Sequence, residues 1–235
     1  MLINLLRQGF TTDAVIQLLL FIPVILISLT VHEYCHGYAA YLCGDTTAKW
    51  NGRLTLNPLK HLDPLGTIMM LFFGFGYARP VPINPRNFKN YRWGLCIVSF
   101  AGPLSNVLLA IIGLVLRYTI LQIIVVQQNE VAMNVLSSNL YGAWDIFSSV
   151  FVMSNVTLAV FNLIPIPPLD GSRIITSVLP AKIAYYYNKY EQYIMIVVLI
   201  LLWRGGLDGV INFFGTKLLT VLEFLVQLIP FTFLR

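Results

Sequence analysis

Three ionisable side chains lie close together at the end of a long apolar stretch, where His32, Glu33 and His36 form the pattern H-E-x-x-H. On a helix, residues four positions apart share a face, so His32 and His36 can point their imidazoles at one metal ion. Glu33 lies about 100° around the helix, where its carboxylate can take a proton from water without being a ligand. Imidazole suits Zn²⁺, which takes nitrogen and oxygen ligands in tetrahedral geometry. The pattern therefore indicates a hydrolytic zinc site.

A catalytic zinc needs a third protein ligand and one open position for water. Asp170 is the candidate, because it directly follows a proline-rich break, Pro165 to Pro168, at the end of an apolar stretch. Irregular backbone next to an ionisable group in such a stretch indicates a functional site. The alternative, compatible with this role, is that Asp170 caps the helix that follows. His61 lies in a charged loop and is expected to be an ordinary surface histidine.

The composition excludes several classes of protein. Of the 235 residues, 57% are hydrophobic and 11% are charged, with a mean hydropathy of +0.76, whereas soluble domains carry about 25% charged residues. So few charges cannot cover a soluble enzyme, and they argue against a disordered chain or a nucleic-acid binder. The three cysteines suggest neither a disulfide framework nor a cysteine zinc site. A multi-pass integral membrane protein fits the composition, with the lipid bilayer as partner.

The apolar stretches predict an all-α polytopic bundle of about five to six transmembrane helices. A helix crosses a bilayer with about 20 residues. We expect a single domain over residues 1–235, with a core at 14–180 and C-terminal helices at 181–235. The strongest uncharged stretches are 14–31, 94–116 and 146–169, and the weaker candidates are 192–203 and 209–230.

The basic residues predict the topology. Ten of the fifteen lysines and arginines fall in three connections, at 45–63, 79–92 and 170–189, and none falls at 122–141. Basic residues gather on the cytoplasmic side of membrane proteins, so the first three connections are expected there and the fourth outside. The metal site would then lie nearer the cytoplasmic face, and the net charge of +5 mostly records this topology.

Two shorter segments complete the expected architecture. The run Pro64–Ala78 would begin and end on the same side, which predicts a re-entrant segment beside a cavity. Residues Gly52–Asn57 alternate polar and apolar side chains, which favours a short β-strand or hairpin near the active site, with an irregular interfacial loop as the alternative. The sequence Gly102–Asn106 either allows close helix contact or places Asn106 in a polar cavity, holding substrate backbone or a neighbouring loop.

Together these motifs resemble the site-2 protease family of intramembrane zinc metalloproteases, and specifically its compact prokaryotic branch. The resemblance covers about residues 25–180 in the family's order, and we identify no inserted PDZ-like or appended CBS-like segment. It rests on His32–His36, Arg53–Pro58, Ala78–Pro85, Gly102–Asn106 and the stretch Asn162–Gly171.

The resemblance implies one Zn²⁺ per chain, bound by His32, His36 and Asp170, with Glu33 as general base. It also implies a polar role for Asn162 near the substrate carbonyl and its oxyanion, and Asn106, if it lines the cavity, is the second candidate for contact with substrate. The implied activity is an endopeptidase that cuts within or near the membrane span of a single-span protein, in a prokaryotic cytoplasmic membrane, for regulated intramembrane proteolysis. The oligomeric state stays open.

Two rival functions remain. A polar-lined transporter would show paired broken helices in two corresponding halves, and the sequence shows one such break. A catalytically silent membrane scaffold would have lost Glu33 or a metal ligand, and all of these residues are present.

Overall fold

The computed structural model describes residues 12–73, 78–127 and 135–229, and all regular structure in these ranges is helical. Two short 3₁₀ turns, η1 (Pro58–Lys60) and η2 (Pro85–Asn87), lie in the loops. The α-helices are α2 (Thr12–Leu42), α3 (Thr47–Trp50), α4 (Pro64–Phe73), α5 (Tyr91–Gln127), α6 (Val135–Leu163), α7 (Asp170–Val178), α8 (Ala181–Lys189), α9 (Glu191–Trp203) and α10 (Asp208–Gln227).

Four helical segments in the described ranges are long and apolar enough to cross a membrane, which makes the chain an integral membrane protein. The expected count of five to six spans is not confirmed. Helix α9 has 13 residues and spans about 20 Å, which is short of the roughly 30 Å hydrocarbon core. The four segments are Leu19–Leu42, Tyr91–Ile120, Gly142–Leu163 and Asp208–Gln227.

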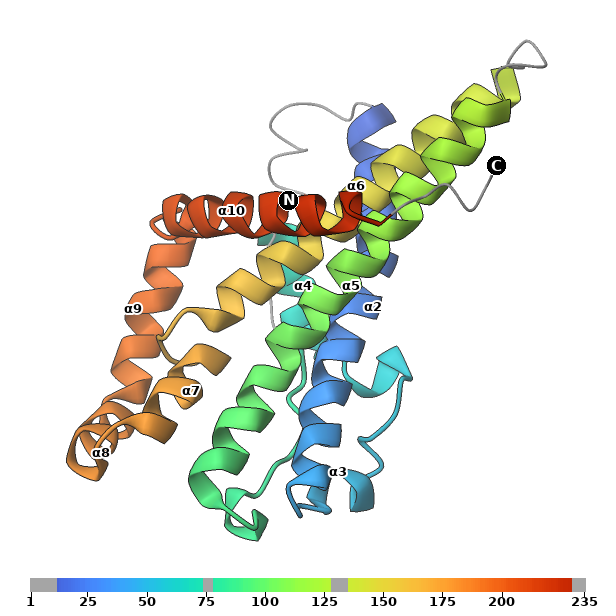
Figure 1. Ribbon diagram of the computed structural model, residues 1–235. Coiled ribbons are helices and arrows are strands. Elements are labelled where there is room, and N and C mark those ends of the chain that lie inside the picture. Colours follow the sequence, from blue (N-terminus) through green and yellow to red (C-terminus); the bar gives the residue numbers. More distant parts are fainter. Residues whose placement is uncertain (1–11, 74–77, 128–134, 230–235) are drawn as a thin grey trace.

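Helices α2, α5 and α6 pack together as the central bundle, and α10 crosses the upper part of the α5–α6 pair while α9 stands apart (Figure 1). Small residues let these helices approach closely. At Gly113 of α5, an added Cβ would lie only 2.9 Å from atoms of Phe151 and Val152 of α6. The buried apolar cluster between α5, α6 and α10 consists of Ala110, Leu114, Val152, Val156, Leu222 and Val226.

The proline-rich break separates α6 from α7. Helix α6 ends at Leu163, and α7 begins at Asp170. The turn is tight, because a Cβ at Gly171 would lie 2.3 Å from the carbonyl oxygen of Leu163, so only glycine fits there. The hydroxyl of Tyr187 donates to the carbonyl of Pro165 and ties α8 to the break. The break turns the start of α7 back toward α5, against which α7 packs.

The predicted strand at Gly52–Asn57 is not confirmed, because these residues form turns and irregular loop. The amide of Arg53 donates to the carbonyl of Ala48 at 2.9 Å, which closes a turn after α3. The side chain of Asn57 accepts from the amide of Leu59 at 3.1 Å and caps η1. A strand needs a neighbouring extended backbone for its hydrogen bonds, and these local turns leave residues 52–57 without one in the described part of the chain.

The run Pro64–Ala78 begins and ends at one place. The amide of Arg79 donates to the carbonyl of His61 at 2.8 Å, so the chain leaves and returns at the same point. Between them, α4 has 10 residues and spans only about 15 Å. Residues 74–77, part of the predicted re-entrant segment, lie outside the described residues.

His61 is not the surface residue that the sequence suggested, since only 1% of it is exposed. Its Nε2 atom lies 2.8 Å from the carbonyl oxygen of Thr55. The expectation was wrong because the loop folds back on itself, and the chain returns at Arg79 to pair with the backbone of His61.

Asp45 joins the end of α2 to the segment before α5. Its buried carboxylate accepts from the amide of Thr47 at 3.1 Å, the amide of Asn84 at 2.7 Å and the side chain of Asn87 at 2.8 Å. Burial alone would raise the pKa of Asp45, but these hydrogen bonds outweigh it and lower the pKa below its usual value. The charged form thus stabilises the fold at neutral pH, and this stabilisation is lost only as the pH falls below about 4 and then through the lowered pKa.

We therefore expect Asp45→Ala to destabilise the protein by about 2–3 kcal/mol, because it leaves buried amides unpaired. In detergent at pH 7 this corresponds to a fall in Tm of about 5–10 °C. Asp208→Ala removes an exposed carboxylate and is the control. An unchanged Tm for Asp45→Ala would contradict the proposed stabilising role of these hydrogen bonds.

Candidate metal centre

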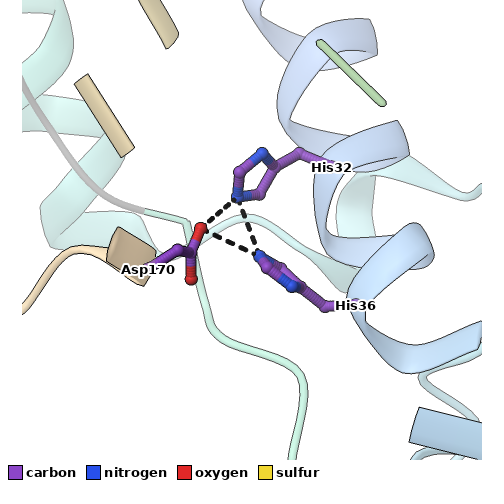
Figure 2. A group of neighbouring side chains, drawn as sticks. All are labelled: His32, His36 and Asp170. Carbon is purple, nitrogen blue, oxygen red and sulfur yellow. Dashed lines mark hydrogen bonds and ion pairs between the residues drawn. The ribbon is translucent and has the colours of Figure 1, made fainter. Parts of the chain in front are cut away.

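Side chains from two distant parts of the chain meet at one point (Figure 2). His32 and His36 lie on successive turns of α2, and Asp170 begins α7. The two Nε2 atoms are 3.0 Å apart, and Oδ2 of Asp170 lies 3.2 Å from each of them. Both imidazoles are buried. The three residues predicted as metal ligands from the sequence are thus brought together, with their ligand atoms within 4.8 Å of one another.

The hydrogen bonds behind the two imidazoles leave three lone pairs facing one another. Nδ1 of His36 lies 2.7 Å from the carbonyl oxygen of Val98, which can only accept, so Nδ1 carries the proton. Nδ1 of His32 likewise faces Oδ1 of Asn106 at 2.6 Å. Burial alone would raise the pKa of Asp170, but its contacts with the two imidazoles outweigh it and hold the pKa well below its usual value, so the carboxylate is charged. With both imidazoles neutral and protonated on Nδ1, the two Nε2 atoms and Oδ2 of Asp170 are three acceptors that a cation can bridge.

The spacing of these atoms fits zinc. With bonds of about 2.0–2.1 Å in tetrahedral geometry, zinc ligands lie about 3.3 Å apart, close to the observed 3.0–3.2 Å. Two imidazoles and one carboxylate form a ligand set of the catalytic type, which keeps its fourth position open for water. The hydrogen bonds from Nδ1 to Asn106 and Val98 are the outer contacts that orient such ligands.

Gly102 of α5 provides the space that the imidazoles occupy. A Cβ atom at Gly102 would lie 2.3 Å from Nε2 of His36 and 2.6 Å from Cε1 of His32. Any larger residue would push the two rings out of position. The sequence Gly102–Asn106 thus serves close contact at its glycine, one of the two readings that the sequence left open.

Glu33 belongs to the same helix but is not one of the three clustered residues. Its Oε2 atom accepts a hydrogen bond from the backbone amide of Val81 at 3.0 Å. The other carboxylate oxygen is not used in this hydrogen bond. Residues 79–84 have no regular secondary structure, and Val81 lies against this face of α2, close to Gly37.

Arg53 holds the backbone of Arg79 and Pro80 in place. The Nη2 atom of its buried guanidinium donates to the carbonyl oxygens of Arg79, at 2.6 Å, and Pro80, at 3.3 Å. Burial lowers the pKa of Arg53, as does the nearby charge of Arg79, whereas Glu33 opposes the shift. Arg53 thus fixes the backbone immediately before the amide that binds Glu33.

The two asparagines predicted near the substrate lie in different surroundings. The side chain of Asn162 donates to the carbonyl of Leu158 in its own helix at 2.9 Å, so its role stays a prediction. Asn106 is fully buried, and its Nδ2 atom donates to Oδ1 of Asn155 at 3.0 Å and to the carbonyl of Ser28 at 3.4 Å. Its oxygen faces His32, and the expected contact of Asn106 with substrate stays a prediction.

Sequence reasoning gave no individual role to three residues whose contacts the structure reveals: Asn155, Arg53 and Asp45. Only Asn155 had a usable signal, since it lies seven residues before Asn162 on the same face of an otherwise apolar helix. The contacts of Arg53 and Asp45 depend on how loops fold back, which no local pattern records.

Comparison with known proteins indicates a zinc metalloprotease. Peptidase family M50 matches residues 20–204. YwhC of Bacillus subtilis, whose name places it among the zinc metalloproteases, is 43% identical over 203 residues, covering 81% of this chain and 89% of its own. Rip2 of Mycolicibacterium smegmatis, named likewise, is 29% identical over 195 residues, covering 78% and 66% of the two chains. No solved structure matches the chain.

Helices that can cross a membrane, together with a cluster of two histidines and an aspartate that could hold a metal ion, describe an integral membrane protein with a candidate metal centre. The chain belongs to peptidase family M50, the site-2 proteases, and is a zinc metalloendopeptidase. Zinc is its cofactor, and its substrates are proteins.

Gly102→Ala tests the packing around the imidazoles. Because the added methyl displaces His36, zinc affinity should fall at least about tenfold, or about 1.4 kcal/mol. Competition with a chelator measures the affinity. Gly142→Ala, whose Cβ meets nothing within 4 Å, is the matched control, and equal affinities in the two variants would refute the argument.

Proposed function

We propose that the protein is an intramembrane endopeptidase that hydrolyses peptide bonds within or near the membrane span of single-span protein substrates. One observation carries this proposal: the cluster of His32, His36 and Asp170 lies where α2 and α7 meet α5, inside a bundle of membrane-crossing helices. A peptidase whose reactive centre lies among such helices most readily meets segments of membrane proteins.

In this proposal His32, His36 and Asp170 hold the zinc, and Glu33 is the general base. Bound zinc supplies Lewis acidity, which polarises a peptide carbonyl and makes water nucleophilic near neutral pH. Glu33 accepts the proton of the attacking water and gives it to the leaving amine. The amide of Val81 holds one carboxylate oxygen at 3.0 Å, which leaves the other for this proton. Asn162 is the proposed donor to the developing oxyanion.

We further propose that residues 1–235 form one catalytic domain in a prokaryotic cytoplasmic membrane, with its centre nearer the cytoplasmic face. The concentration of basic residues in the connections 45–63, 79–92 and 170–189 supports this orientation. The hydrogen bond between Arg79 and His61 at 2.8 Å supports a re-entrant segment between them. Such a segment gives water a route to a depth that lipid would otherwise keep dry.

Glu33→Gln tests the proposed base. The amide keeps the shape of the side chain but cannot take a proton at neutral pH, so cleavage of a model transmembrane substrate should fall by roughly 10²–10⁴-fold. Zinc content, measured by elemental analysis, should stay at one per chain. Turnover near that of the unmodified protein would rule out Glu33 as general base.

Asp170→Ala tests the third ligand. Two imidazoles alone hold zinc more weakly than three ligands, so the purified variant should lose zinc and activity together. Asp208→Ala, on exposed helix surface, should keep both. Full zinc content in Asp170→Ala would remove Asp170 from the ligand set.

A further inference from the structure

Asn155 is a buried polar side chain that the proposed mechanism does not use. It lies in the apolar helix α6, and 0% of its surface is exposed. Its Nδ2 atom donates to the carbonyl of Phe151 at 2.9 Å, and its Oδ1 accepts from Nδ2 of Asn106 at 3.0 Å. Asn106 in turn faces His32. A continuous line of hydrogen bonds therefore runs from α6 through α5 to α2.

The donors and acceptors along this line of hydrogen bonds can be arranged in only one way. A backbone carbonyl only accepts, so the carbonyl of Phe151 turns the NH₂ group of Asn155 toward itself and the oxygen toward Asn106. The NH₂ group of Asn106 must then face Asn155, at 3.0 Å, with a longer contact to the carbonyl of Ser28 at 3.4 Å, and its oxygen must face His32. Asn155 is thus the nearer of the two acceptors that hold this orientation. Nδ1 of His32 consequently carries the proton, and Nε2 keeps its lone pair, directed at His36 and Asp170.

The two imidazoles differ in how firmly the proton is held on Nδ1. Nδ1 of His36 meets a backbone carbonyl, that of Val98, and a backbone carbonyl cannot exchange its oxygen for a donor. Nδ1 of His32 meets a side-chain amide, and an amide that turns over presents NH₂ instead of oxygen. Once turned, Asn106 would favour the tautomer of His32 that carries its proton on Nε2, at the position where a metal must bind.

We propose that Asn155 is a positioning residue for the metal centre, which fixes the orientation of the Asn106 amide and thereby the metal-binding tautomer of His32. The inference rests on the proposed function, since it takes His32 as a zinc ligand. It gives the buried side chains of Asn155 and Asn106 a role in supporting the metal site rather than in binding the substrate. Its physical basis is that an outer hydrogen bond selects which imidazole nitrogen binds a metal.

The test uses the full-length protein in detergent and two replacements. Asn155→Leu has similar volume but makes no hydrogen bond, and it should lower zinc affinity about 10–100-fold in competition with a chelator. Asn155→Asp, whose protonated form can donate to Phe151 and accept from Asn106, should recover most of that loss. Ser148→Ala removes another buried polar group of α6, one that bonds only the carbonyl of Asp145 in its own helix, and should bind like the unmodified protein.

A spectroscopic measurement reads the tautomer directly. In the metal-free protein labelled with ¹⁵N-histidine, the ring nitrogens of His32, assigned with His32→Ala, should report a proton on Nδ1. In Asn155→Leu the proton should move to Nε2. A role in helix packing alone would leave this signature unchanged, so an unchanged tautomer would overturn the proposal.

The outcomes separate this proposal from the ligand assignment. Lost zinc binding in His32→Ala, with unchanged binding in Asn155→Leu, overturns the positioning role alone. Unchanged binding in both variants overturns His32 as a ligand, and the positioning role with it. An equal loss in Asn155→Leu and Ser148→Ala would reveal a general effect of altered packing and would also overturn the proposal.

Discussion

Two imidazole nitrogens and a carboxylate oxygen face one another at 3.0–3.2 Å inside an apolar helical bundle. Three unshared lone pairs repel at this distance, and burial strengthens the repulsion because little water screens it. A metal ion or a proton between them relieves this repulsion, and otherwise the surrounding structure must hold the three groups in place. The rest of the fold around the centre serves this second requirement, so that the ligand atoms are already in position when the metal binds.

Each neighbouring element meets the requirement in its own way. Helix α2 sets the spacing of the two histidines, and Gly102 of α5 leaves room for both rings. The break between α6 and α7 delivers Asp170, since Gly171 permits a turn that a Cβ would block at 2.3 Å. The outward nitrogens end on Val98 and Asn106. Contacts from four helices, α2, α5, α6 and α7, thus together keep the three ligand side chains in position.

The sequence was sufficient for the residues of the cluster, because helical spacing and the scarcity of charge make His32, His36 and Asp170 conspicuous. It was insufficient where burial or pairing depends on distant chain. Residues 52–57 alternate like a strand, but alternation cannot supply the second backbone that a strand needs. His61 reads as a loop histidine until the chain returns at Arg79 and covers it. The count of five to six spans is not confirmed, because the short apolar run at 192–203 forms α9, whose 13 residues do not reach across a bilayer.

Glu33 illustrates why H-E-x-x-H does not define a site by itself. The pattern places Glu33 on the helix, but the direction of its carboxylate is set by the amide of Val81 at 3.0 Å. That amide is positioned in turn by Arg53, which binds the two preceding carbonyls. The proposed base therefore takes its orientation from Val81 and Arg53, which both lie outside the motif, in the loops that follow α2. The guanidinium of Arg53 thus contributes to positioning Glu33, as helix α2 does. The same chain of contacts lies beside the point where His61 meets Arg79, so the position of the proposed base and the closure of the segment between these two residues rest on one set of hydrogen bonds.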